Sequence, residues 1–95
     1  MRKTLRSAEY TCFLGLLTDA RRKARLTQHD VAARLEKPQS FIAKYENGER
    51  RLDVVEFVTI ARALDADPLK LFKGLLATTQ AGSGKLDVRK RHAGK

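Results

Sequence analysis

The stretch that decides the fold lies at residues 26–48 and reads LTQHDVAARLEKPQSFIAKYENG. Thr27 can accept a hydrogen bond from a backbone amide one turn further on, and Asp30 stands where the acidic residue of a capping box belongs. A helix is therefore predicted to begin at this point. Its apolar stripe, at helical spacing, is formed by Val31, Ala32 and Leu35.

A second short helix follows after a tight turn. Pro38 disfavours helical backbone at the residue before it, and it suits the first turn of a new helix. Ile42 and Tyr45 share the inward face of that helix, and Asn47-Gly48 ends it with residues that tolerate the left-handed conformation. The outward face is then left to Gln39, Ser40, Ala43 and Lys44. The pattern predicts two helices joined by a turn, the second with a polar outer face.

With these spacings, the chain resembles the helix-turn-helix family that contains phage repressors, Cro proteins and the xenobiotic-response-element (XRE) regulators. The resemblance extends over about Ser7 to Leu76. The matching positions are Leu26, Thr27, Gln28, Leu35, Gln39, Ser40, Ile42, Lys44, Tyr45, Glu46 and Gly48. It implies an all-α, five-helix, repressor-like DNA-binding domain. The function it implies is sequence-specific regulation of transcription, repression more than activation, with the third helix in the major groove of double-stranded DNA.

The resemblance also implies which side chains meet DNA. Gln39, Ser40 and Lys44 would reach base edges, whereas Gln28 and Asn47 would contact the phosphate backbone. The chemistry is suitable, because glutamine can pair with adenine and lysine can donate to guanine. Phe41 could lie against a thymine methyl group, although it could equally belong to the core. Four further basic residues are candidates for phosphate contacts, namely Arg34, Lys37, Arg50 and Arg51. The alternative for these four, and for Gln39, Ser40 and Lys44, is that they are simply solvated surface residues.

Three further features come from the comparison with the family pattern. The family often pairs an arginine late in the first helix with the glutamate that ends the recognition helix, and Arg21 and Glu46 occupy these positions. Glycine is common at the turns held here by Arg25 and Glu36. If both turns keep the family geometry, each non-glycine residue costs about 1 kcal/mol. Ala43 stands where a polar residue is frequent, which removes one possible contact.

Composition agrees with a nucleic-acid partner. The 95 residues are enough for one small domain with a modest core, and 20 Lys and Arg against 11 Asp and Glu give a net charge of +9 and a pI near 10.2. Cys12 is the only cysteine, and with His29 and His92 it lacks zinc-ligand spacing. We therefore expect no metal, no cofactor and no enzymatic activity. We also expect a cytoplasmic protein, since neither a membrane-spanning run nor a signal peptide is visible.

The expected domain organisation has three parts. Residues 1–6 form a short basic arm, residues 7–76 the helix-turn-helix domain, and residues 77–95 a flexible basic tail, because too little of that tail is apolar. Within the domain, the first helix runs from a Ser7 cap to about Ala24. The fourth begins at the capping pattern of Asp53 and Glu56, and the fifth begins at Asp67-Pro68 and ends near Leu76.

A homodimer is the expected binding form, because one helix reads too few base pairs for useful discrimination in a genome. The most plausible contact is the surplus apolar surface of the fifth helix, made by Leu71, Phe72, Leu75 and Leu76. Two other functions stay open. One is an antitoxin that represses its own operon through the same domain and neutralises a toxin protein. The other is a bridging cofactor that recruits transcription proteins and binds DNA weakly or not at all.

Overall fold

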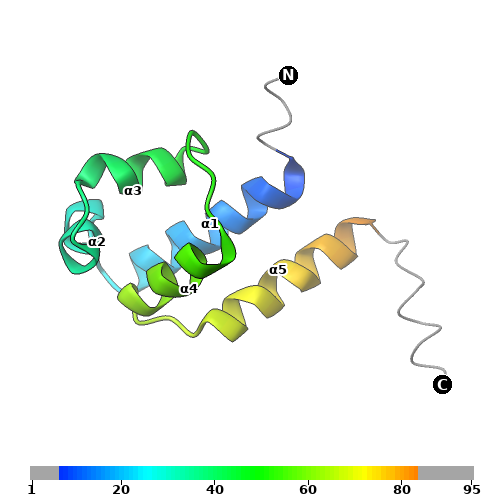
Figure 1. Cartoon of the computed structure of the whole chain (residues 1–95). Helices are drawn as coiled ribbons and strands as arrows, with labels where there is room; N and C mark the ends of the chain where they lie inside the picture. The colour runs from blue at the N-terminus through cyan, green and yellow to red at the C-terminus, as the bar shows by residue number, and fades with distance from the viewer. Residues whose placement is uncertain (1–6, 84–95) are drawn as a thin grey trace.

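The computed structural model describes residues 7–83, which form five helices and no strand (Figure 1). The helices are α1 (Ala8–Lys23), α2 (Gln28–Leu35), α3 (Gln39–Glu46), α4 (Val54–Ala63) and α5 (Pro68–Ser83). The longest two, α1 and α5, pack side by side, and α3 lies against α1 and α2 on the opposite side of the molecule from α5. The all-α, five-helix prediction is confirmed.

Helices α1, α2 and α4 begin where their capping residues predict. The hydroxyl of Ser7 accepts the amide of Tyr10 at the start of α1. Thr27 and Asp30 form a complete capping box at α2, and Asp53 and Glu56 form another at α4. Each box satisfies two backbone amides that the helix itself leaves without a partner.

Two boundary predictions need correction. Pro38 is the N-cap of α3 (φ −71°, ψ 154°) and not a first-turn residue, because its extended backbone completes the turn before the helix begins at Gln39. The tail was expected from residue 77, but α5 continues to Ser83. Residues 77–83 have no proline to stop the helix, and the polar composition that suggested a tail is compatible with helix once the preceding turns have formed. The basic arm and residues 84–95 lie outside the described part of the chain.

Four helices end in the same way, with a residue of positive φ after the last turn. These residues are Arg25 (φ 62°), Glu36 (57°), Gly48 (81°) and Asp65 (62°). In each turn the amide of the next residue donates to the carbonyl five positions earlier, at 2.8–3.1 Å, which is the hydrogen bond of a Schellman motif. Only one of the four is glycine, so three turns of this small domain carry backbone strain.

The strain at the turn between α2 and α3 can be measured. We expect Glu36→Gly to raise the free energy of unfolding by about 1 kcal/mol, because glycine adopts positive φ without steric cost. The matched control is Ala33→Gly, also exposed but inside α2, which should lower the same free energy by about 1 kcal/mol. Urea unfolding of both variants checks the prediction; a loss of stability in Glu36→Gly would show that the carboxylate matters more than the strain.

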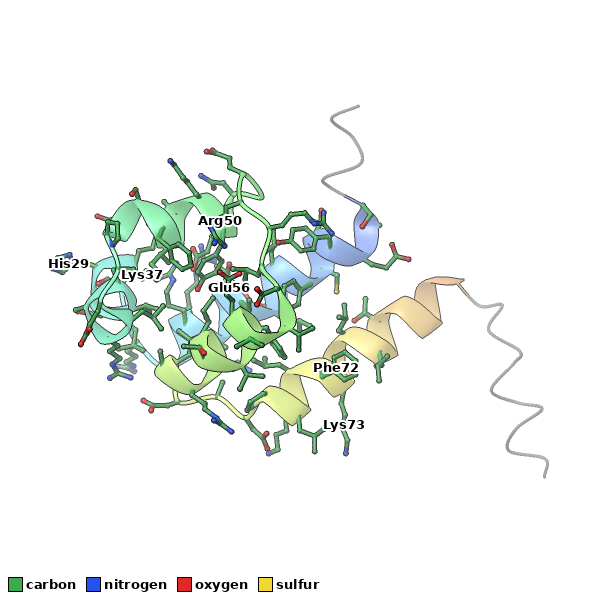
Figure 2. The ribbon with its side chains drawn as sticks, in the orientation of Figure 1. His29, Lys37, Arg50, Glu56, Phe72 and Lys73 are labelled. Atoms are coloured by element: carbon green, nitrogen blue, oxygen red, sulfur yellow. The ribbon has the colours of Figure 1, made fainter. Side chains whose placement is uncertain are left out.

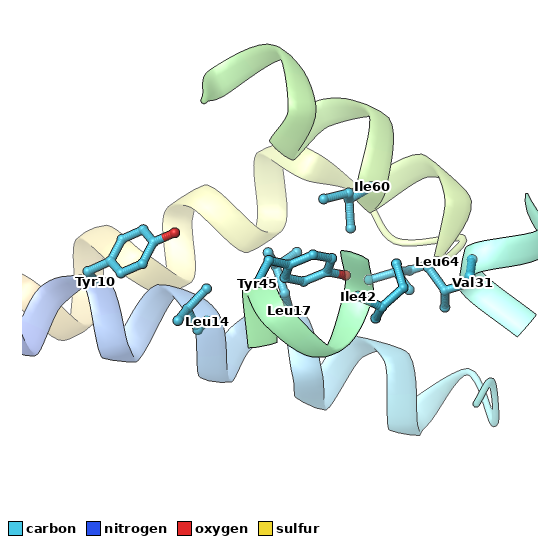
Figure 3. Packing of buried hydrophobic residues seen from close by; sticks show 9 residues of the cluster. Tyr10, Leu14, Leu17, Val31, Ile42, Tyr45, Ile60 and Leu64 are labelled. Atoms are coloured by element: carbon cyan, nitrogen blue, oxygen red, sulfur yellow. The ribbon is translucent and has the colours of Figure 1, made fainter. Parts of the chain in front are cut away.

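The core joins all the helices that position α3. Its largest fully buried side chains are Leu17, Val31, Ile42, Tyr45, Ile60 and Leu64 (Figure 3). Leu14 and Tyr10 extend the cluster along α1, and the Tyr10 hydroxyl accepts the Leu52 amide at 3.1 Å. Because Ile42 and Tyr45 enter this core from α3, the opposite face of that helix must point outward.

Candidate nucleic-acid interface

The outer face of α3 carries the polar side chains expected to read bases. Gln39, Ser40 and Lys44 are exposed, whereas Ile42 and Tyr45 of the same helix are 0% exposed. Asn47, which follows the helix, is exposed too. The helix therefore presents hydrogen-bonding groups outward on a backbone that the core holds in place.

A largely buried ion pair ties the end of α3 to α1. Arg21 Nε donates to Glu46 Oε2 at 2.8 Å and Arg21 Nη2 donates to Glu46 Oε1 at 3.1 Å, a bidentate contact. The side chains are only 12% and 7% exposed. The hydrogen bond to Glu46 raises the pKa of Arg21, so the guanidinium stays charged. Arg21 Nη1 also donates to the Leu26 carbonyl, which holds the turn between α1 and α2.

The same carboxylate reaches the outer face through two glutamines. Gln28 Nε2 donates to Glu46 Oε1 at 2.9 Å, and Gln39 Nε2 donates to Gln28 Oε1 at 3.1 Å. A chain of hydrogen bonds thus runs from the largely buried Arg21 to exposed Gln39. It restricts the rotamers of Gln39 before any ligand binds, which reduces the entropy lost on binding.

Tyr45 lies in the core beside this network. Its side chain packs in the centre of the cluster (Figure 3), and the ring of Phe41 meets it edge-on with centroids 5.7 Å apart. Burial raises the pKa of the Tyr45 phenol well above its usual range, so the ring remains neutral.

Phe41 is half-buried and packs against the core, so the alternative noted from sequence has structural support. Two cations flank its ring: Lys37 Nζ lies 5.2 Å from the ring centroid, and Arg50 Cζ lies 4.8 Å from it. Both distances allow cation–π attraction. Contact with a thymine methyl group would require part of the ring edge to remain accessible.

The residues expected at phosphates have intramolecular contacts of their own. Arg34 Nη1 donates to the Ala63 carbonyl at 2.7 Å and to Asp65 Oδ2 at 3.0 Å, at the turn between α4 and α5. This contact favours a structural role for Arg34 over the expected phosphate contact. The Arg51 guanidinium lies 4.2 Å from the centroid of the Tyr10 ring. Lys37 is exposed at the start of the α3 face.

Arg50 also has a structural partner that the sequence did not suggest. Its Nη1 and Nη2 donate to the two carboxylate oxygens of Glu56, at 3.2 and 2.8 Å (Figure 2). The sequence signal for Glu56 was its capping box alone, and nothing in the spacing of residues 50 and 56 identifies an ion pair. The positive φ of Asp65 was not predicted from the sequence either.

Residues 7–83 contain no cluster of three or more His, Cys, Asp or Glu side chains that could bind a metal ion. Among these residues no helix combines the length and apolar character needed to span a membrane.

Comparison with known proteins places this arrangement in a family. The helix-turn-helix family HTH_3 matches residues 17–71, which include α2, α3 and α4 entirely. A solved structure of an XRE-family like protein from Pseudomonas syringae pv. tomato str. DC3000 is 49% identical in sequence and superimposes with a TM-score of 0.75, over 82% of this chain and 95% of that one. No curated protein matches the chain. The chain therefore belongs to the XRE family of helix-turn-helix DNA-binding transcription regulators.

Proposed function

We propose that this protein is a sequence-specific repressor that inserts α3 into the major groove of double-stranded DNA. The observation that carries the proposal is the division of α3 into two faces. Ile42 and Tyr45 are fully buried, while Gln39, Ser40 and Lys44 project from a helix that is also held by the Arg21–Glu46 pair. A rigid helix with an amide, a hydroxyl and an ammonium on its outer face matches the donors and acceptors of the major groove.

The proposed contacts fall into two classes. Base edges would be read by Gln39, Ser40 and Lys44, with Phe41 contributing at most its ring edge. Phosphates would be held by Lys37, Asn47 and Gln28. The net charge of +9 supports binding of the duplex before any sequence is recognised.

The binding form would be a homodimer. An apolar groove of about 560 Å³ lies beside the starts of α1 and α4 and the middle of α5, lined by Tyr10, Phe13, Val54, Phe57, Phe72 and Leu75 among others. Val54, Phe72 and Leu76 are 75%, 47% and 42% exposed. Contiguous exposed apolar surface is typical of protein–protein contacts. A second copy bound to this surface would give a dimer with two α3 helices, one for each of two half-sites.

Repression is the simplest output of such a dimer. A dimer bound to two adjacent half-sites would block the access of a polymerase to that stretch of duplex. Repression would then require no further activity of the protein. A toxin protein on the same apolar groove would instead indicate the antitoxin role. Co-purification of one defined partner with loss of the homodimer would favour that role.

The test is selection of bound sites from random duplexes at one fixed salt concentration. The proposal predicts an enriched palindrome whose half-sites lie about one helical turn apart, about 10 base pairs. Binding without any enriched sequence would contradict sequence-specific regulation, and an absence of binding would favour the bridging cofactor.

A further inference from the structure

The side chain of Arg50 is one of the groups that hold the loop connecting α3 to α4. The guanidinium of Arg50 donates to the Arg51 carbonyl at 2.9 Å and forms the bidentate pair with Glu56 described above. Its other neighbour is the ring of Phe41, 4.8 Å away on the recognition helix. Arg50 therefore contacts both α3 and α4, although it belongs to neither.

Glu56 is itself held by the start of α4. Its Oε1 atom accepts the Asp53 amide at 2.9 Å as part of the capping box, and the Asp53 carboxylate accepts the Glu56 amide at 2.7 Å. The hydrogen bonds from Arg50 and from the Asp53 backbone lower the pKa of the Glu56 carboxyl. The carboxylate is therefore charged and fixed in position, so it can direct the Arg50 guanidinium.

Phe41 transmits this constraint to α3. The ring packs against the core and meets Tyr45 edge-on, with Lys37 and Arg50 flanking it. Phe41 lies between Gln39 and Lys44 in the sequence of α3 and is therefore within one helical turn of both. Its contacts with the core and with Arg50 therefore lie on the part of α3 that carries the proposed base-reading side chains.

We propose that Arg50 and Glu56 are specificity-determining positioning residues, which fix the orientation of α3 relative to DNA through the Phe41 ring. The inference rests on the proposed function. It assigns Arg50 to sequence discrimination, in contrast to the phosphate contact expected from its sequence position. It also gives an acidic residue, Glu56, a favourable role in binding a polyanion.

This role makes predictions that a charge-based role does not. If Arg50 contacted a phosphate, its loss would weaken binding to all sequences and reduce the slope of log Kd against log salt by about 0.9. If Glu56 affected DNA only through its charge, its neutralisation would strengthen binding to every duplex. Positioning predicts weaker binding to the selected site alone.

The experiment compares Glu56→Gln and Arg50→Lys with the wild-type full chain. Glutamine keeps an oxygen for the Asp53 amide but loses the ion pair, and lysine keeps the positive charge but loses the planar bidentate contact. We expect each variant to lose about tenfold in affinity for the selected site and less than about twofold for a random duplex, with an unchanged salt slope.

The matched control is Asp65→Asn. It raises the net charge by one, as Glu56→Gln does, and removes the exposed Arg34–Asp65 pair at the turn between α4 and α5. Asparagine also tolerates the positive φ of residue 65. The ratio of affinities for selected and random duplexes should not change in this variant.

A readout without DNA separates this inference from the proposed function. Backbone amide chemical shifts of residues 39–46 should change in Glu56→Gln and Arg50→Lys but not in Asp65→Asn. When Phe41 is already replaced by leucine, the additional change Arg50→Lys should leave these chemical shifts unaltered. Unchanged α3 shifts, or equal losses on both duplexes, would overturn the positioning role. Wild-type protein without preference for any duplex would overturn the proposed function, while the α3 shifts still report whether Arg50 and Glu56 orient the helix.

Discussion

Truncation of Glu46 to alanine is expected to lower the free energy of unfolding by about 3–5 kcal/mol. The side chain is only 7% exposed, and its loss leaves the Arg21 guanidinium charged and without its bidentate partner. Gln28 Nε2 loses its acceptor at the same time. Arg21→Ala should have an effect of similar size, because it leaves the Glu46 carboxylate buried without its cation.

The exposed pair between α2 and the turn after α4 provides the control. Arg34 and Asp65 have side chains 43% and 72% exposed, so Asp65→Asn should change the free energy of unfolding by less than about 1 kcal/mol. The double variant Arg21→Ala/Glu46→Ala should cost less than the sum of the two single changes, since side chains in direct contact couple. Strict additivity in urea unfolding would contradict the buried pair.

Gln39→Ala is expected to weaken binding to the selected DNA site by about 1–3 kcal/mol and to leave binding to random duplex nearly unchanged. A base-edge contact contributes discrimination, and the loss of a neutral amide does not alter the electrostatic attraction. Gln39 is exposed and its side chain donates to Gln28 on the surface of the domain, so the fold should tolerate the change.

Lys37→Ala serves as the contrasting variant for Gln39→Ala. As a proposed phosphate contact it should weaken binding to both duplexes alike and reduce the salt slope by about 0.9. Equal losses of Gln39→Ala on selected and random duplexes would remove Gln39 from the set of base-reading residues.

The starts of α1, α2 and α4 could be predicted from the sequence because capping is local. Thr27 with Asp30, and Asp53 with Glu56, need only residues three positions apart, so their spacing was sufficient. The end of α5 was not predicted. Polar residues after Leu76 carry no stop signal, and a helix that is already formed extends at little cost.

The candidate site was predictable to the extent that it depends on one helix. The inward positions of Ile42 and Tyr45 follow from helical spacing, and this leaves Gln39, Ser40 and Lys44 outside. The Arg21–Glu46 contact came from resemblance to a family, since nothing in spacing relates residues 25 positions apart. The partners of Arg34 and Arg50 depend on how α4 packs against the rest of the domain. The position of an arginine in the sequence cannot distinguish a phosphate contact from an ion pair within the protein.

The central claim is that α3 reads base edges in the major groove. The most direct measurement is methylation interference on the selected site, because dimethyl sulfate modifies guanine N7 in the major groove and adenine N3 in the minor groove. We predict that methylation of guanine N7 within both half-sites blocks binding, and that Lys44→Ala removes the block at particular positions. Interference confined to adenine N3, or absent from both half-sites, would contradict the account.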